Sequence, residues 1–315
     1  INLPKQKYLD LFFLQNISND QIAKMWKREL TILPSLILNP IYFLNKLISY
    51  YFPSVKNHIV TTSKSDRDVH NLLDQFGPHL KFTEEEIAIG EDYLKKFGLS
   101  INSKFVCLIV RDNAYLQNTY PEKNWEYHNY RNYDVDNFMP AAEALTERGY
   151  YVFRMGSKVE KKLKSANKKI IDYASSKDRC DFLDVFLGAK CNFCISTTCG
   201  FDAIPNIFRV PLAYITVPIQ LFFTSSKNFL IMTKHHISKK LNRKLKFSEI
   251  IQNKIGNINT KDGFEKKNIT LVENSPSEIK EFVLEMLDRY ENKWSDDEKN
   301  RMIQTKFWKK PTRTL

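Results

Sequence analysis

Glycine and cysteine are scarce in this sequence, and each shortage excludes a class of protein. Nine of the 315 residues are glycine, and no glycine-rich phosphate loop is present. The five cysteines are too few and too clustered for the disulfide framework of a small secreted protein. Gly-x-Ser-x-Gly and His-Glu-x-x-His motifs are missing too. The sequence therefore does not support a P-loop ATPase, a hydrolase with a nucleophile elbow, or a zinc protease.

Long apolar runs are missing as well. The most apolar stretch, from Ile32 to Phe52, is broken by prolines, asparagines and a lysine, and it falls short of the ~20 apolar residues that a membrane span needs. Residues 1–20 carry scattered charges and lack the apolar core of a signal peptide. We therefore expect a cytoplasmic protein without a membrane-spanning helix.

Composition and charge are those of a globular protein with anionic partners. Hydrophobic residues make up 43% and charged residues 27% of the chain. The length predicts about two domains. Lysine and arginine exceed aspartate and glutamate by 12, which favours phosphate groups, nucleic acid or an acidic membrane surface as partners.

The first hundred residues have mostly helical patterns. Residues 19–30 are expected to form a short helix, and residues 41–51 show the three- and four-residue apolar spacing of a helix. Thr83, followed by three glutamates, predicts the start of a helix that runs to about Phe97. Gly98 fits the C-terminal cap of this helix.

From Lys104 onward, apolar runs typical of buried strands alternate with helical segments. The expected strands are 105–110, 150–155, 170–172, 191–196, 211–216 and 269–272, and the expected helices are 137–148, 181–189, 200–208 and one that starts near residue 276. This alternation predicts an α/β fold with a doubly wound parallel sheet. A polar helix over 295–308 is expected to pack back on the protein through Met302, Phe307 and Trp308.

Candidate ligand-binding residues follow the expected strands, because open parallel sheets bind ligands beyond the carboxyl ends of their strands. Arg111 and Asp112 follow the first strand, and Gly156 follows the second. Arg131 lies in a loop rich in aromatic and amide side chains, which suits stacking on a base or sugar and two-pronged phosphate contacts. A surface salt bridge is the alternative for either arginine.

The turn after the strand that ends at Ser196 is the strongest local signal. The hydroxyl groups of Ser196, Thr197 and Thr198, with Gly200 and the free N–H groups of a helix start, suit a phosphate. Alternatively, Thr198 only caps the following helix.

Proton transfer needs a base near such a site, and His128, Asp112 and Asp134 are the candidates. Packing among neighbouring tyrosines is the alternative for His128. Cys191 and Cys194 have the spacing of a zinc or redox pair. Both fall on an expected strand, where residues three apart point to opposite faces, so buried structural thiols are favoured.

Much of the positive charge gathers in one segment. Residues 227–267 contain eleven Lys or Arg against three acidic residues, and apolar residues 221–223 and 229–232 lie beside them. Residues 221–267 therefore suit an anionic membrane surface or nucleic acid. The alternative is a solvated face preceded by a core segment.

Five segments, taken in order, resemble a known family: residues 106–112, 128–134, 149–156, 181–184 and 196–205. The series resembles the GT-B-like glycosyltransferases of bacterial surface-polysaccharide gene clusters. It is also similar to the donor domain of bacterial and animal fucosyltransferases. The likeness covers residues 100–215, with a weaker one at 26–30 and 307–308.

The resemblance implies roles for the residues already named. Arg111 and Arg131 would hold the donor pyrophosphate or sugar, with Thr197, Thr198 and Gly200 at the diphosphate, whereas Asp202 would contact the ribose or cap the helix. The implied enzyme moves a hexosyl or deoxyhexosyl group from a nucleotide-sugar donor to a glycan or polyprenyl-linked acceptor. It would act without a metal ion or other cofactor, at the inner face of the cytoplasmic membrane, and nucleic acid is not an expected partner.

The resemblance also implies two domains of comparable size, whereas only about 100 residues precede the expected sheet and the first residue is Ile1 rather than Met. We expect 1–100 to be an incomplete acceptor-side region, 101–294 the nucleotide-sugar-binding domain, and 295–315 a helix that packs back. Part of the acceptor domain, and with it the catalytic base, is expected to precede Ile1. Two other hypotheses are a non-enzymatic nucleic-acid-binding protein and a relative that binds sugar nucleotides without catalysis.

Overall fold

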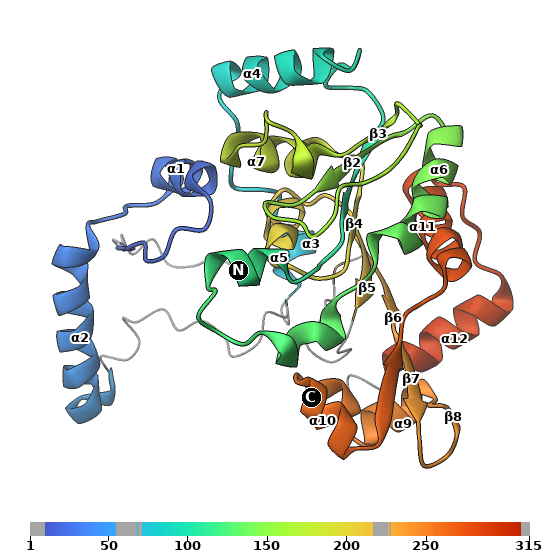
Figure 1. Ribbon diagram of the computed structural model, residues 1–315. Helices are drawn as coiled ribbons and strands as arrows, with labels where there is room; N and C mark the ends of the chain where they lie inside the picture. The colour runs from blue at the N-terminus through green and yellow to red at the C-terminus, as the bar shows by residue number, and fades with distance from the viewer. Residues whose placement is uncertain (1–9, 55–67, 69–70, 217–225, 227, 310–315) are drawn as a thin grey trace.

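A six-stranded parallel sheet forms the centre of the protein in the computed structural model, which describes residues 10–54, 68, 71–216, 226 and 228–309 (Figure 1). Its strands are β1 (Phe105–Ile109), β2 (Tyr151–Met155), β3 (Ile170–Ile171), β4 (Cys194–Ser196), β5 (Leu212–Thr216) and β6 (Phe229–Thr233). Their spatial order is β3-β2-β1-β4-β5-β6, and all neighbouring pairs are parallel. The predicted doubly wound α/β fold is therefore confirmed.

Helices cover both faces of the sheet, α6 and α11 on one side and α4 and α7 on the other (Figure 1). The α-helices are α1 (Asp20–Glu29), α2 (Ser35–Tyr51), α3 (Leu72–Gln75), α4 (Glu84–Lys95), α5 (Ala114–Thr119), α6 (Met139–Glu147), α7 (Asp181–Lys190), α8 (Ala203–Ile207), α9 (Phe247–Gln252), α10 (Lys261–Lys266), α11 (Pro276–Tyr290) and α12 (Glu298–Lys309). All five residues of β1 are buried between the two helical layers, as the continuous apolar run predicts.

Local signals set several helix boundaries. Thr83 and Glu86 form the capping box of α4, and Ser275 and Glu278 form that of α11. Gly98 follows α4 with a φ of +71°, a left-handed conformation that glycine adopts without strain. The starts predicted for these two helices are therefore confirmed.

Two apolar segments take places in the fold that differ from the prediction. Residues 269–272 form β9 (Ile269–Val272), which pairs antiparallel with β7 (His235–Ser238) in a separate sheet of order β8-β7-β9, where β8 is Arg243–Lys244. Residues 229–232 were predicted to be an exposed apolar patch. They belong instead to β6 and are half-buried at the edge of the parallel sheet. In both cases a short apolar run did not show which strand it would pair with. Residues 221–223 lie outside the described residues.

Two helix boundaries and one expected packing contact also differ from the prediction. α2 starts at Ser35 rather than near residue 41. Cys191 ends α7 instead of lying on a strand, although it and Cys194 are buried free thiols, as predicted. Met302 of α12 is 54% exposed, so it does not make the expected packing contact.

No helix in the described part of the chain is long and apolar enough to cross a membrane. Among the described residues before residue 100, α1 packs against α7, and α4 lies in the same helical layer of the sheet. The division into regions 1–100, 101–294 and 295–315 stays a prediction.

Candidate functional site

The carboxyl ends of β1 and β4 lie side by side at the point where the strand order reverses. The chain moves outward from β1 to β2 on one side and from β4 to β5 on the other, which opens a crevice where such sheets bind ligands. The backbone N–H of Arg111 donates to Thr197 Oγ1 at 2.7 Å, and that of Thr197 donates to the Ile109 oxygen at 3.2 Å. Two of the predicted loops therefore meet at this crevice.

Two arginine side chains lie at the crevice, and neither forms an ion pair within the described part of the chain. Nε and Nη2 of Arg111 and Nε of Arg131 are buried, and no described group accepts a hydrogen bond from them. Arg131 Nη2 donates to the Thr198 backbone oxygen at 3.0 Å. Burial, followed by the positive charge of Arg131, lowers the pKa of Arg111. Partly burying a cation that has no ion-pair partner is costly, so the arrangement favours an anionic ligand.

His128 lies in the short 3₁₀ helix that also carries Arg131 (Glu126–Arg131). Its ring centroid is 6.2 Å from that of Trp125 and 4.0 Å from that of Tyr127. Burial first, and then the charges of Arg111 and Arg131, lower the pKa of His128. The imidazole is therefore neutral at pH 7 and able to accept a proton. Both readings of this residue, packing among aromatic rings and a base beside the site, fit its position.

The hydroxyl groups of the turn after β4 are used in the structure of the turn itself. Ser196 Oγ donates to Asp202 and accepts from the Thr198 N–H at 3.0 Å, while Thr198 Oγ1 donates to the Thr197 oxygen at 2.6 Å. The side chains of Ser196, Thr197, Thr198 and Asp202 are buried. Burial raises the pKa of Asp202 to about 7, although hydrogen bonds from Ser196 and the Cys199 N–H lower it. Contacts of these residues with a ligand stay a prediction.

The backbone of this turn is strained. Thr198 has a φ of +61°, in the left-handed region that β-branched residues rarely adopt. Strain of this kind is concentrated at functional sites, where the surrounding structure holds it in place. Here the hydrogen bonds with Ser196 and Arg131 hold the strained residue.

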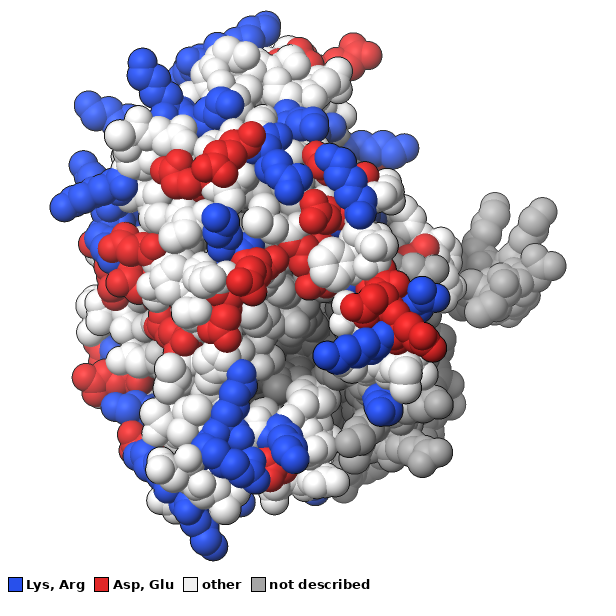
Figure 2. Space-filling model, turned by 90° about the vertical axis from the view of Figure 1, so that its right-hand side faces the viewer, with Lys and Arg blue, Asp and Glu red and all other residues white. Residues whose placement is uncertain are grey.

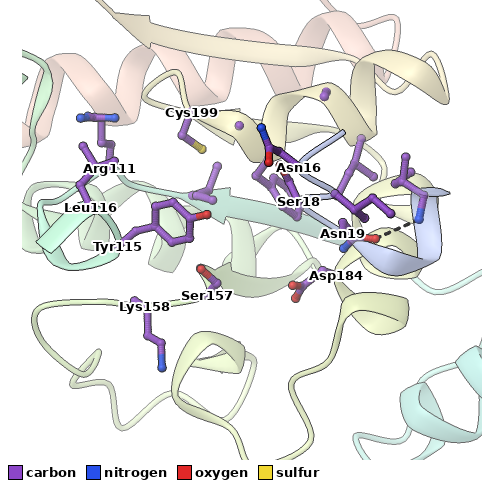
Figure 3. A pocket seen from close by; sticks show the side chains of 18 of the residues that line it. Asn16, Ser18, Asn19, Arg111, Tyr115, Leu116, Ser157, Lys158, Asp184 and Cys199 are labelled. Carbon is purple, nitrogen blue, oxygen red and sulfur yellow. Dashed lines mark hydrogen bonds between the residues drawn. The ribbon is translucent and has the colours of Figure 1, made fainter. Parts of the chain in front are cut away.

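A cavity of about 710 Å³ opens beside Arg111 (Figure 3). Arg111 and Tyr115 lie toward one end of it and Asp184 and Asn19 toward the other. The lining comes from the ends of β1 and β2, from α5, from the turn after β4, and from residues 14–26 at the N-terminal side. The cavity therefore combines residues that are far apart in the sequence.

The N-terminal wall of the cavity is fixed by polar contacts with the helices of the sheet. Asn19 Nδ2 donates to the Asp181 oxygen at 3.1 Å, and the Asp20 N–H donates to the Asp181 carboxylate at 2.8 Å. Arg28 forms an ion pair with Glu86 of α4 at 3.0 Å. Nothing in the sequence pattern indicates that this wall belongs to the site.

The other predicted residues are divided between the cavity and its surroundings. Asp112, Gly156 and Gly200 line the cavity with Arg111. The two carboxylate oxygens of Asp112 accept from the backbone N–H groups of Ala114 and Glu160, each at 3.0 Å. Asp112 therefore joins the loops that follow β1 and β2.

Asp134 lies apart from the cavity, on the rim of a second hollow of about 290 Å³ that Asp112 also lines. It is exposed, and its hydrogen bond with Lys161 lowers its pKa. Asp136 binds the same lysine at 2.6 Å. No three His, Cys, Asp or Glu side chains converge as metal ligands would among the residues that the structure describes.

Lys234 is a residue of the site that sequence reasoning missed, because it was counted with the basic segment. It is buried, and burial lowers its pKa to about 8. Its Nζ donates to the Asn132 oxygen at 2.5 Å and lies 3.9 Å from the ring centroid of Tyr133. Through these two contacts Lys234 holds in place the loop that carries Arg131 and His128.

The rest of the basic segment lies in the small sheet and its helices, at the lower end of the molecule in Figure 1. Figure 2 shows basic side chains at the upper and lower ends of one face, with a band of acidic side chains between them. Arg243 is neutralised by Glu249 at 2.7 Å. On this face acidic side chains therefore interrupt the positive charge, so the face does not offer nucleic acid a continuous basic track.

Comparison with known proteins finds similarity among solved structures. No protein-family model and no curated protein matches the sequence. Among solved structures, the chain is similar to a glycosyl transferase of family 9 from Veillonella parvula DSM 2008, with 15% identity and a TM-score of 0.43 over 72% of this chain. It is also similar to the ADP-heptose lps heptosyltransferase II of E. coli, with 15% identity and a TM-score of 0.34 over 67% of this chain. The chain spans 62% and 54% of the lengths of these two proteins.

Proposed function

We propose that this chain is a glycosyltransferase that takes a hexosyl or deoxyhexosyl group from a nucleotide-sugar donor. The single observation that carries the proposal is the pair of partly buried guanidinium groups of Arg111 and Arg131, which form no ion pair with a described carboxylate at the switch point of the sheet. A diphosphate would supply the missing negative charge through charge-assisted hydrogen bonds. The cavity beside Arg111 offers room for the rest of a sugar nucleotide.

The same residues suit the chemistry of glycosyl transfer. When the bond between the sugar and the diphosphate breaks, negative charge grows on the leaving diphosphate. Arg111 and Arg131 would stabilise that charge, which is why we propose a reaction that needs no metal ion. His128, neutral at pH 7 and next to both arginines, would accept the proton of the acceptor hydroxyl.

The acceptor and the cellular setting follow from the resemblance of residues 100–215 to glycosyltransferases of surface-polysaccharide gene clusters. We propose a glycan or polyprenyl-linked acceptor, and action at the inner face of the cytoplasmic membrane. Residues 14–26, which line the cavity, would then lie on the side from which the acceptor approaches the donor.

Calorimetric titration of the chain with UDP, GDP, ADP and CMP, and then with the corresponding sugar nucleotides, tests the proposal. We expect one nucleotide to bind, and Arg111→Ala to weaken that binding. Arg148→Ala is the matched control, because Arg148 is a half-exposed arginine at the C-terminal end of α6, 3.7 Å from Asp288 of α11. Failure of every nucleotide to bind, or unchanged binding by Arg111→Ala, would contradict the proposal.

Turnover separates the proposed enzyme from the two other hypotheses. Release of the nucleoside diphosphate from the bound sugar nucleotide is expected of a transferase. Binding without release would instead identify a relative that has lost catalysis. Oligonucleotide binding that weakens steeply with salt, without nucleotide binding, would identify a nucleic-acid-binding protein.

A further inference from the structure

Helix α2 stands at the edge of the molecule, away from the central sheet (Figure 1). Its inner side is marked by Leu38 and Ser49, which are buried. Near its start it contacts a short segment before α1, through a hydrogen bond of 3.1 Å between Gln15 and Asn39 and a ring contact of 6.0 Å between Phe13 and Tyr42.

The outer side of α2 is apolar and exposed. With 3.6 residues per turn, Leu36, Phe43 and Leu47 fall on the side of the helix away from Leu38 and Ser49. Phe43 is 62%, Leu44 56% and Leu47 60% exposed. Exposed apolar residues continue on both flanks of this line, so the face covers about half of the helix circumference. A contiguous apolar face of this size marks an interaction surface.

We propose that the outer face of α2 binds the surface of an anionic lipid bilayer, with the helix lying in the plane of the interface. A helix of this length extends roughly 25 Å along the surface, and no described helix is suited to crossing the bilayer. Tyr50 and Tyr51 at its C-terminal end are exposed, and tyrosine favours the boundary between lipid headgroups and acyl chains.

The charges of the sequence around α2 favour an anionic lipid surface over a protein as the binding partner. From Leu30 to Ser65 the sequence contains no acidic residue, whereas Lys46 lies on α2 itself. Lys27 is exposed on the neighbouring helix α1, where Lys24 pairs with Glu86 at 3.3 Å. Basic residues beside an inserted apolar face add attraction to anionic headgroups. A helix that pairs with a second copy in water uses a narrower apolar seam flanked by charges of both signs, which α2 lacks.

The proposed surface differs from the membrane contact predicted for residues 221–267, part of which is β6. It also stands independently of the proposed enzymatic function, because lipid binding and nucleotide binding are measured separately on the same chain.

Vesicle flotation of the full chain tests the inference. The vesicles contain phosphatidylcholine alone or an equimolar mixture of phosphatidylcholine and phosphatidylglycerol. We expect the chain to float with the mixed vesicles and much less with phosphatidylcholine. The triple variant Phe43→Gln, Leu44→Gln, Leu47→Gln should reduce the bound fraction at least about tenfold, because three side chains that would be buried in lipid are lost.

The matched control replaces three equally exposed apolar residues elsewhere: Ile89→Gln, Leu241→Gln and Ile303→Gln, at 56%, 51% and 52% exposure. It should float like the unmodified chain. The proposal is overturned if the α2 variant floats to the same extent as the unmodified chain, or if the unmodified chain does not float. So does equal binding to both vesicle types. A dimer in light scattering that the α2 variant dissociates, without flotation, would show that a second copy covers the face.

Discussion

Replacement of Arg111 by methionine separates a ligand-binding arginine from a structural one, because the two roles predict opposite effects on stability. The Arg111 guanidinium is buried at Nε and Nη2, pairs with no described carboxylate, and lies near the like charge of Arg131. Methionine keeps the length of the side chain and removes the charge. We therefore expect the free energy of unfolding of the unliganded chain to rise by about 1 kcal/mol, which is roughly 2–4 °C in Tm.

The same change should weaken nucleotide binding. Loss of hydrogen bonds to a charged diphosphate costs about 1.5–3 kcal/mol, or roughly a ten- to hundredfold increase in Kd. Thermal unfolding with and without the bound nucleotide measures both effects in one assay. Arg148→Met, the control at an exposed arginine, should change Tm and Kd little. A variant of Arg111 that unfolds more easily and binds nucleotide as before would refute the reasoning.

Three further predictions concern titrating groups. Because the pKa of His128 is lowered below 6.5, the transfer rate should rise with pH through a pKa below that value, and His128→Asn should remove this limb; a limb above pH 6.5 would argue against His128 as the base. The pKa of Asp202 is raised from 3.8 to about 7, so its folding contribution is lost as pH rises across that range, by roughly 4 kcal/mol at most. Urea unfolding at pH 5 and pH 8 should show that the free energy of unfolding of Asp202→Asn, relative to the unmodified chain, is higher at pH 8 than at pH 5. The same difference between the two proteins at both pH values would contradict this. Burial alone raises the pKa of Glu86, but hydrogen bonds from Arg28, Gln21 and Thr83 bring it to about 2. Its stabilisation is therefore present above pH 4.5 and lost toward pH 2, and Glu86→Gln should abolish that acid-dependent loss in the same assay.

The fold could be predicted to the extent that it depends on local pattern. Buried parallel strands need continuous apolar runs, so β1, β2 and β5 are visible in the sequence. Capping residues such as Thr83 and Ser275 fix helix starts through hydrogen bonds within four residues. Pairing partners lie beyond this range, and for that reason β9 was assigned to the wrong sheet and β6 was missed.

The sequence by itself determined the alternation of strands and helices, and with it the strand ends at which Arg111 and the turn after Ser196 lie. It could do so because helical and strand periods are properties of neighbouring residues. Only the tertiary structure decided that Arg111 and Arg131 share a crevice in which neither pairs with a described carboxylate, that residues 14–26 line the cavity, and that the outer face of α2 is exposed. These features depend on which distant segments meet, and burial and charge compensation are set only once they do.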